Sequence, residues 1–98
     1  MAHYVALCNW TQEGIKDARN ALGQMDRAIE YIEKRGAKIK AVYWTLGQYD
    51  MIVVLEGPDD EHAVLTAMGI GAAGLIRTTT LRAFDRDEMA KILAAAAG

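Results

Sequence analysis

The sequence is poor in the features that would place a chain outside the cell or in a membrane. It has one cysteine and one proline among 98 residues. Because a single cysteine cannot form an intrachain disulfide, Cys8 is typical of a reducing compartment. No run approaches the roughly 18 uninterrupted apolar residues of a transmembrane helix, and the first residues lack the basic and apolar regions of a signal peptide. We therefore expect a cytoplasmic protein without a membrane partner.

The sequence also lacks a large excess of positive or negative charge. Eleven Lys and Arg residues stand against 13 Asp and Glu residues, which gives a net charge of -2, and like charges do not gather into long blocks. A polyanion-binding face is therefore not expected, which argues against a nucleic-acid partner. The apolar share is 52%, slightly above the usual value of about 45–50%. In a chain this short, that excess favours apolar surface that is buried by oligomerisation.

Hydrophobic periodicity predicts one domain over residues 1–98. We expect strands at 3–10, 38–46, 49–56 and 75–84, and helices at 12–35, after Asp59, and after Asp85, where Asp85 and Glu88 have the spacing of a capping box. This order predicts an α+β fold: a ferredoxin-like βαββαβ sandwich with an additional C-terminal helix, in which two helices cover one face of the sheet.

The first helical segment carries apolar residues at spacings of three and four: Ile15, Ala18, Leu22, Met25, Ile29 and Ile32. A continuous helix over 12–35 would be roughly 36 Å long, whereas an eight-residue strand spans only about 27 Å. We therefore expect a break near Asn20 and Gly23, with the main helix at Leu22–Arg35. In the next helix we expect an apolar face of Ala63, Val64, Ala67 and Met68, and an end at Gly69, Gly71 and Gly74.

Residues 43–50, YWTLGQYD, predict a hairpin with Gly47 and Gln48 in a two-residue turn. Cross-strand partners then have numbers that sum to 95. One face pairs Leu46–Tyr49, Trp44–Met51, Val42–Val53 and Lys40–Leu55; the other pairs Thr45–Asp50, Tyr43–Ile52, Ala41–Val54 and Ile39–Glu56.

Both faces of this hairpin are largely apolar, whereas a hairpin with one wet face should alternate. We infer that both faces of the sheet are buried, one by the helices and the other by a second copy of the sheet. The expected partner is therefore the chain itself, in a homodimer or higher oligomer of the dimeric α+β-barrel type.

Several separated segments resemble the GYD-domain family: NW-T at residues 9–11, AVYWTLGQYD at 41–50, PDDE at 58–61 and RTTTLRAF at 77–84. The name-giving Gly-x-Tyr-Asp segment reads Gly47-Gln48-Tyr49-Asp50. The resemblance covers nearly the whole chain and departs from the family near residues 20–26, where a Ser-Pro break is common and this chain has NALGQMD. It implies a ferredoxin-like, dimeric α+β-barrel architecture and no established activity.

Other motifs resemble chemical sites but do not favour one. GIGAAG at 69–74 has the spelling of a dinucleotide fingerprint, but here the helix precedes the glycines and the strand follows, so no cofactor is expected. Cys8 and His3 differ by an odd number on one strand, so they face opposite ways and form no catalytic dyad within a subunit. His3 and His62 have no partner at metal-ligand spacing, so no metal is expected.

Asp50, with Thr45 and Tyr43 on one hairpin face, forms the best polar cluster beside aromatic rings. Its carboxylate could act as a general base, or it could accept hydrogen bonds from turn amides or an arginine. Arg77 and Arg82 lie on opposite faces of the fourth strand. Each could form a structural ion pair, for instance with Asp50 or Glu56 of another subunit, or could bind an anionic ligand.

Three hypotheses remain. The first is a ligand-binding or assembly module with a small-molecule cavity between the sheet and its partner, lined by Trp10, Tyr43, Trp44, Tyr49, Asp50 and Arg77. The second is a small cofactor-independent enzyme of the dimeric α+β-barrel type, similar to monooxygenases or isomerases, that uses Asp50, Tyr43 and an arginine. The third is a purely structural subunit with a filled sheet interface. No catalytic residue is assigned.

Overall fold

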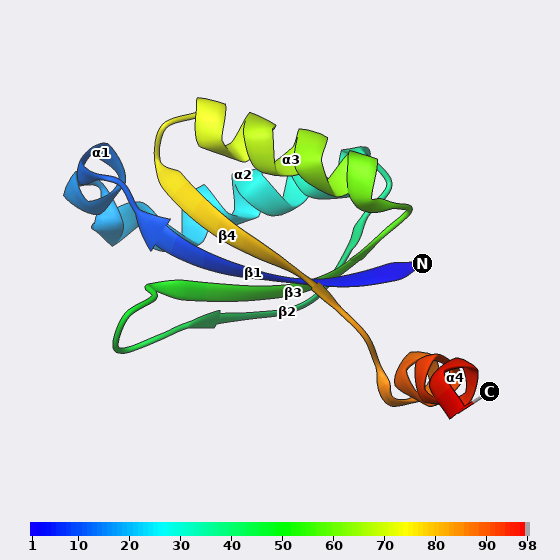
Figure 1. Cartoon of the computed structure of the whole chain (residues 1–98). Coiled ribbons are helices and arrows are strands. Elements are labelled where there is room, and N and C mark those ends of the chain that lie inside the picture. Colours follow the sequence, from blue (N-terminus) through cyan, green and yellow to red (C-terminus); the bar gives the residue numbers. More distant parts are fainter. Residues whose placement is uncertain (98) are drawn as a thin grey trace.

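Four antiparallel strands form one sheet in the computed structural model, which describes residues 1–97 (Figure 1). The strands are β1 (Ala2–Trp10), β2 (Lys38–Trp44), β3 (Met51–Gly57) and β4 (Ile76–Ala83), in the spatial order β2-β3-β1-β4. The two central strands are β3 and β1, and β2 and β4 are the edges. This is the strand order that two interleaved βαβ units produce.

The helices are α1 (Gln12–Lys16), the 3-10 turn η1 (Ala18–Asn20), α2 (Ala21–Lys34), α3 (Asp60–Ala72) and α4 (Arg86–Ala97). Helices α2 and α3 lie side by side over one face of the sheet, and α4 projects from the end of β4 (Figure 1). The predicted α+β, ferredoxin-like fold with an additional C-terminal helix is confirmed. The core lies between the sheet and α2, and includes Tyr4, Cys8, Met25, Ile32, Met51, Val53 and Leu55.

The predicted break in the first helical segment is confirmed, but it comes slightly earlier, at Asp17–Asn20. The buried Gln24 accounts for it. Its Nε2 donates to the carbonyl oxygens of Asp17 (3.0 Å) and Gly14 (3.4 Å), which also accept the backbone amides of Asn20 and Asp17 at the break. After the break, Met25 and Ile32 of the predicted stripe are buried, whereas Leu22 is exposed.

The prediction for α3 is wrong in two respects. The helix continues through Gly69 and Gly71, and Gly74, with φ of 84°, follows its end. At Gly69 the hydroxyl of Tyr31 lies where a Cβ would stand, so any larger residue there would require the Tyr31 side chain to move. Two residues of the predicted apolar face, Val64 and Met68, are 58% and 65% exposed. The prediction failed because α3 has apolar residues on all sides, so periodicity could not identify its buried face.

The hairpin register is confirmed from Trp44–Met51 to Ala41–Val54. A β-bulge at Lys40 then shifts the pairing, so Ile39 lies opposite Leu55 and Lys38 opposite Glu56. The predicted pairs Lys40–Leu55 and Ile39–Glu56 are therefore wrong, since a bulge adds one residue to one strand.

The turn of this hairpin is wider than predicted. Residues 45–50 lie outside the strands, so Leu46 and Tyr49 are not a strand pair, although the amide of Thr45 donates to the carbonyl of Asp50 at 2.8 Å. Gly47 has φ of 116°, a conformation that glycine adopts without strain. Leu46 is fully exposed at the tip of the turn.

Candidate functional site

The predicted site residues divide between the two faces of the sheet. Tyr43 lies opposite Ile52 on the face without helices, and Trp44 lies opposite the buried Met51 on the face that carries them. Tyr49 is half-buried in the turn, where its carbonyl accepts a hydrogen bond from the hydroxyl of Thr45 at 2.5 Å. The rings therefore do not converge on one cavity within a single chain.

Trp10 and Asp50 are brought together, although not as a binding pocket. The Asp50 carboxylate accepts the backbone amide of Trp10 at 3.0 Å, and the Trp10 indole donates to Gln24 on α2 at 3.0 Å. Asp50 thus accepts a backbone amide, as the structural alternative predicted. The amide belongs to Trp10 of β1 and not to the turn. It lines neither of the two cavities described below.

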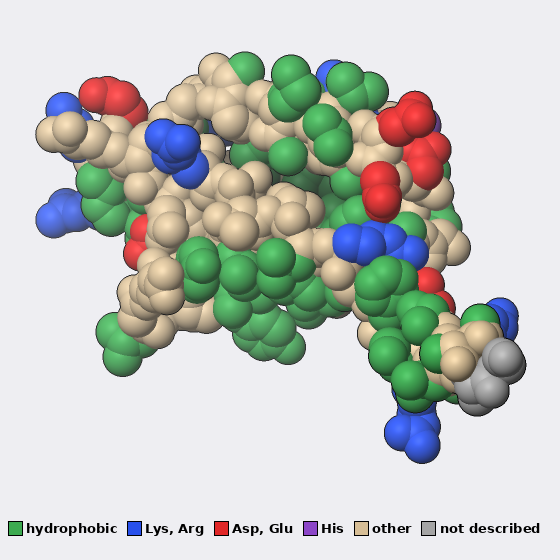
Figure 2. Space-filling model, in the orientation of Figure 1, with side chains coloured by type: hydrophobic (Ala, Val, Ile, Leu, Met, Phe, Trp, Pro, Cys, Tyr) green, Lys and Arg blue, Asp and Glu red, His purple; other side chains and the backbone are tan. Residues whose placement is uncertain are grey.

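The helix-free face of the sheet carries two apolar rows that cross the strands. One row is formed by Leu81, Val5, Val54 and Ala41; the other is formed by Thr79, Leu7, Ile52 and Tyr43. Figure 2 shows hydrophobic side chains gathered along this underside of the sheet. Polar residues flank the two rows along the strands, with His3 and Glu56 beyond one row and Asn9 and Arg77 beyond the other. We call this surface the open sheet face.

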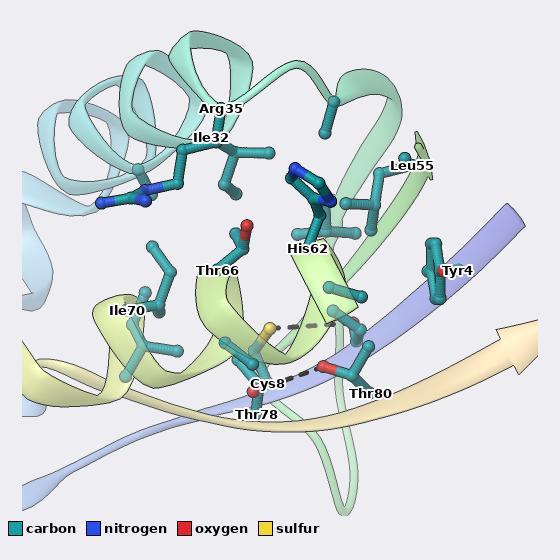
Figure 3. Close-up of a pocket in the computed structure, with 18 of the residues that line it drawn as sticks. Tyr4, Cys8, Ile32, Arg35, Leu55, His62, Thr66, Ile70, Thr78 and Thr80 are labelled. Carbon is teal, nitrogen blue, oxygen red and sulfur yellow. Dashed lines mark hydrogen bonds between the residues drawn. The ribbon is translucent and has the colours of Figure 1, made fainter. Parts of the chain in front are cut away.

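The opposite face encloses an apolar cavity of about 60 Å³ between the sheet and helices α2 and α3 (Figure 3). On α3 the small side chains of Ala63, Thr66 and Ala67 line it between the larger His62 and Ile70. Cys8 lies on its floor, where burial raises the pKa of the thiol to about 11. A thiol protonated at neutral pH is a poor nucleophile, so the cavity has no activated cysteine.

The side chain of His3 lies on the open sheet face, away from Cys8, and contacts three carboxylates. Its Nε2 is 3.2 Å from Asp85 Oδ2 and 3.3 Å from Glu88 Oε1, and its Nδ1 is 3.6 Å from Glu56 Oε1. Sequence spacing could not reveal this group, because it joins the first strand to the last helix.

His3, Asp85 and Glu88 could offer three atoms to a metal ion. Asp85 and Glu88 already form the predicted capping box, in which each accepts the other's backbone amide at 2.8 and 3.1 Å. Capping also lowers the pKa of Asp85, chiefly through the amide of Glu88. The cluster is thus accounted for by the helix cap and by the contacts of His3 with Asp85 and Glu88, which join β1 to α4.

Arg82 forms structural ion pairs, as one of the two alternatives for the arginines predicted. Its partners are Asp60 and Glu88 of the same chain, not Asp50 or Glu56 of another subunit. It lies 3.5 Å from Asp60 and 3.6 Å from Glu88, and its guanidinium lies over the ring of Phe84 at 4.5 Å. Arg77 forms no ion pair with any residue that the structure describes. It therefore remains a candidate for binding an anion.

A four-stranded antiparallel sheet with two helices on one face and an apolar second face defines an α+β sandwich of the ferredoxin-like class. The family model of the GYD domain matches residues 4–93, and the chain belongs to this family. None of the curated proteins matches the sequence. Within residues 1–97, no helix has both the length and the apolar character needed to cross a membrane.

Two examples represent the solved structures that are similar in fold. A homoserine dehydrogenase from Thiobacillus denitrificans aligns at a TM-score of 0.61 and 15% identity, over 86% of this chain but only 17% of that one. The protein TTHA0845 from Thermus thermophilus aligns at a TM-score of 0.53 and 23% identity, over 87% of this chain and 95% of that one. The chain thus spans less than a fifth of the dehydrogenase. At these identities the likeness shows the fold alone.

Proposed function

We propose that this protein is a homo-oligomeric module, for assembly or ligand binding, that packs its open sheet face against the same face of a second copy. The observation that carries the proposal is the pair of rows across the four strands, which are apolar except at Thr79. An antiparallel sheet with one face in water normally presents polar residues there. Instead Leu81 and Tyr43 are 46% and 60% exposed at the two edges of this face.

The layout of the open sheet face supports a protein partner. Specific interfaces have an apolar centre and a polar rim, and here Val5, Leu7, Ile52 and Val54 are central while His3 and Asn9 lie toward the ends. A two-fold axis through the face would bring each row against the same rows of the partner, as an isologous interface requires. The chain's own surface is therefore a chemically suitable partner.

The ligand part of the proposal concerns a small molecule held between the sheet and its partner. Of the predicted lining residues, the register places Tyr43 and Arg77 on this face, whereas Trp10 and Trp44 belong to the helix side. Such a site would thus draw on Tyr43 at the edge strand β2. The enzyme alternative is less favoured, because Asp50 is engaged by the Trp10 amide.

The test is the mass in solution of two matched variants, measured by light scattering. Leu81→Glu places a charge in an apolar row, whereas Leu22→Glu places the same charge on α2, where Leu22 is 69% exposed. We expect Leu81→Glu to be a monomer and Leu22→Glu to keep the mass of the unmodified protein. If Leu81→Glu keeps that mass as well, the open sheet face is not the interface.

A further inference from the structure

A groove of about 640 Å³ runs between α3 and the edge strand β4, on the helix side of the sheet. The hollow between these two elements is visible in Figure 2. Its volume lies in the range of about 300–1,000 Å³ that is typical of small-molecule sites. The groove is separate from the open sheet face, and none of the proposed self-association depends on it.

The two walls of the groove differ in chemistry. The α3 wall is apolar and consists of Ala63, Val64, Ala67, Met68 and Gly71. The β4 wall carries the hydroxyls of Thr78 and Thr80, which lie 3.4 Å apart and bond only to each other among the described side chains. The groove adjoins the apolar cavity above Cys8, and the two share the lining residues Ala67, Thr78 and Thr80. An apolar body could therefore lie along α3.

The two ends of the groove differ in charge. At one end the positive charge of Arg82 is balanced by Asp60 and Glu88, and Asp60 also accepts the hydroxyl of Tyr4 at 2.6 Å. At the other end lies Arg77, which forms no ion pair with the residues at 1–97. Arg77 lines the groove at the edge strand β4, although its strand position, opposite Asn9, belongs to the open sheet face. The groove thus offers one uncompensated cation beside an apolar wall.

We propose that this groove binds a small amphipathic carboxylate, with the carboxylate on Arg77 and the apolar body along Ala67 and Met68 of α3. A guanidinium binds a carboxylate through two parallel hydrogen bonds, and the hydroxyl of Thr78 lies on the adjacent wall. The acidic side chain of Asp60 at the far end disfavours a ligand with a second negative charge there. The ligand class is therefore a monoanion with a single apolar tail.

The experiment is a calorimetric titration of the whole protein with decanoate, decan-1-ol and decylammonium, each below its aggregation concentration. Decanoate should bind saturably, and decylammonium at least about tenfold more weakly, since only decanoate pairs with Arg77. Arg77→Gln should weaken decanoate binding by about tenfold or more. Arg19→Gln is the matched control, because Arg19 is also exposed and outside any ion pair of the described residues. Equal effects of the two substitutions, or no saturable binding of decanoate, would overturn the proposal.

A second pair of variants tests the apolar wall. Ala67→Leu fills the groove and should reduce decanoate binding, whereas Ala94→Leu on the exposed side of α4 should not. Amide chemical shifts should move at Met68, Arg77 and Thr78 on titration. Shifts confined to Tyr43 and Leu81 would instead place the ligand on the open sheet face and contradict the groove. The Leu81→Glu variant should keep decanoate binding, so failure of self-association and failure of this site are distinguishable.

Discussion

The carboxylate of Asp50 accepts the backbone amide of Trp10 with 3.0 Å between Oδ2 and N. The amide of Asp50 in turn donates to the carbonyl of Cys8 at 2.9 Å. These two bonds extend the pairing of β1 and β3 beyond Met51 and hold the base of the hairpin turn. The aspartate of the Gly-x-Tyr-Asp segment thus fastens the turn to the central strand.

This role predicts a loss of stability when the acceptor is removed. Asp50→Ala should lower the free energy of unfolding by about 1–3 kcal/mol, since the amide of Trp10 loses a charged acceptor. Asp50→Asn should cost less, because its amide oxygen can still accept. Urea denaturation checks both variants. Wild-type stability of Asp50→Ala would show that the bond contributes nothing to folding.

Gly14 should be intolerant of a side chain. A Cβ at this position would overlap the backbone carbonyl of Leu75, which cannot move without disturbing the start of β4. We expect Gly14→Ala to destabilise the protein by about 1–3 kcal/mol, as overpacking does. The denaturation midpoint in urea measures the effect.

Gly71 is the matched control for Gly14. It lies within α3, and a Cβ there would meet nothing within 4 Å. Gly71→Ala should stabilise the protein by about 0.5–1 kcal/mol, because alanine loses less backbone entropy in a helix. Equal destabilisation by both substitutions would contradict the packing of α1 against the start of β4.

Cys8 should not react with a thiol reagent while the protein is folded. Burial raises its pKa to about 11, so the thiolate fraction at pH 8 is on the order of one in a thousand. A chromogenic disulfide reagent should label Cys8 in urea and not in buffer. Rapid labelling of the folded protein at pH 8 would show that the cavity floor is open.

The raised pKa of the Cys8 thiol also predicts that stability depends on pH. The unfolded thiol ionises near its ordinary pKa of 9.0, whereas the folded thiol keeps its proton to about pH 11. The unfolded state therefore binds fewer protons in this interval, and the free energy of unfolding falls as pH rises from 9 to 11. Cys8→Ala should remove this part of the slope. An unchanged slope in that variant would contradict the assignment to Cys8.

Much of the fold was predictable because local signals agreed with one another. The turn at Gly47 and Gln48 defined the hairpin register, and Asp85 with Glu88 defined the start of α4. The bulge at Lys40 was not predictable, since nothing in KIKAV distinguishes a paired residue from an extra one. The buried side of α3 was also hidden, because the helix is apolar all round.

The candidate site was less predictable than the fold. Alternation showed that Tyr43 and Trp44 face opposite ways, but it could not say which face the helices cover. That choice depends on contacts between distant segments, such as Trp10 with Gln24 and Asp50. The groove beside Arg77 arises likewise from α3 and β4 together, and neither segment reveals it alone.

Self-association through the open sheet face is tested most directly by the mass of the unmodified chain in solution. Sedimentation equilibrium from about 1 to 100 μM covers the affinity range of ordinary stable interfaces. The chain has a mass of 10.7 kDa, and we predict a species of at least twice that mass across the range. A single species of 10.7 kDa at every concentration would contradict the proposed assembly.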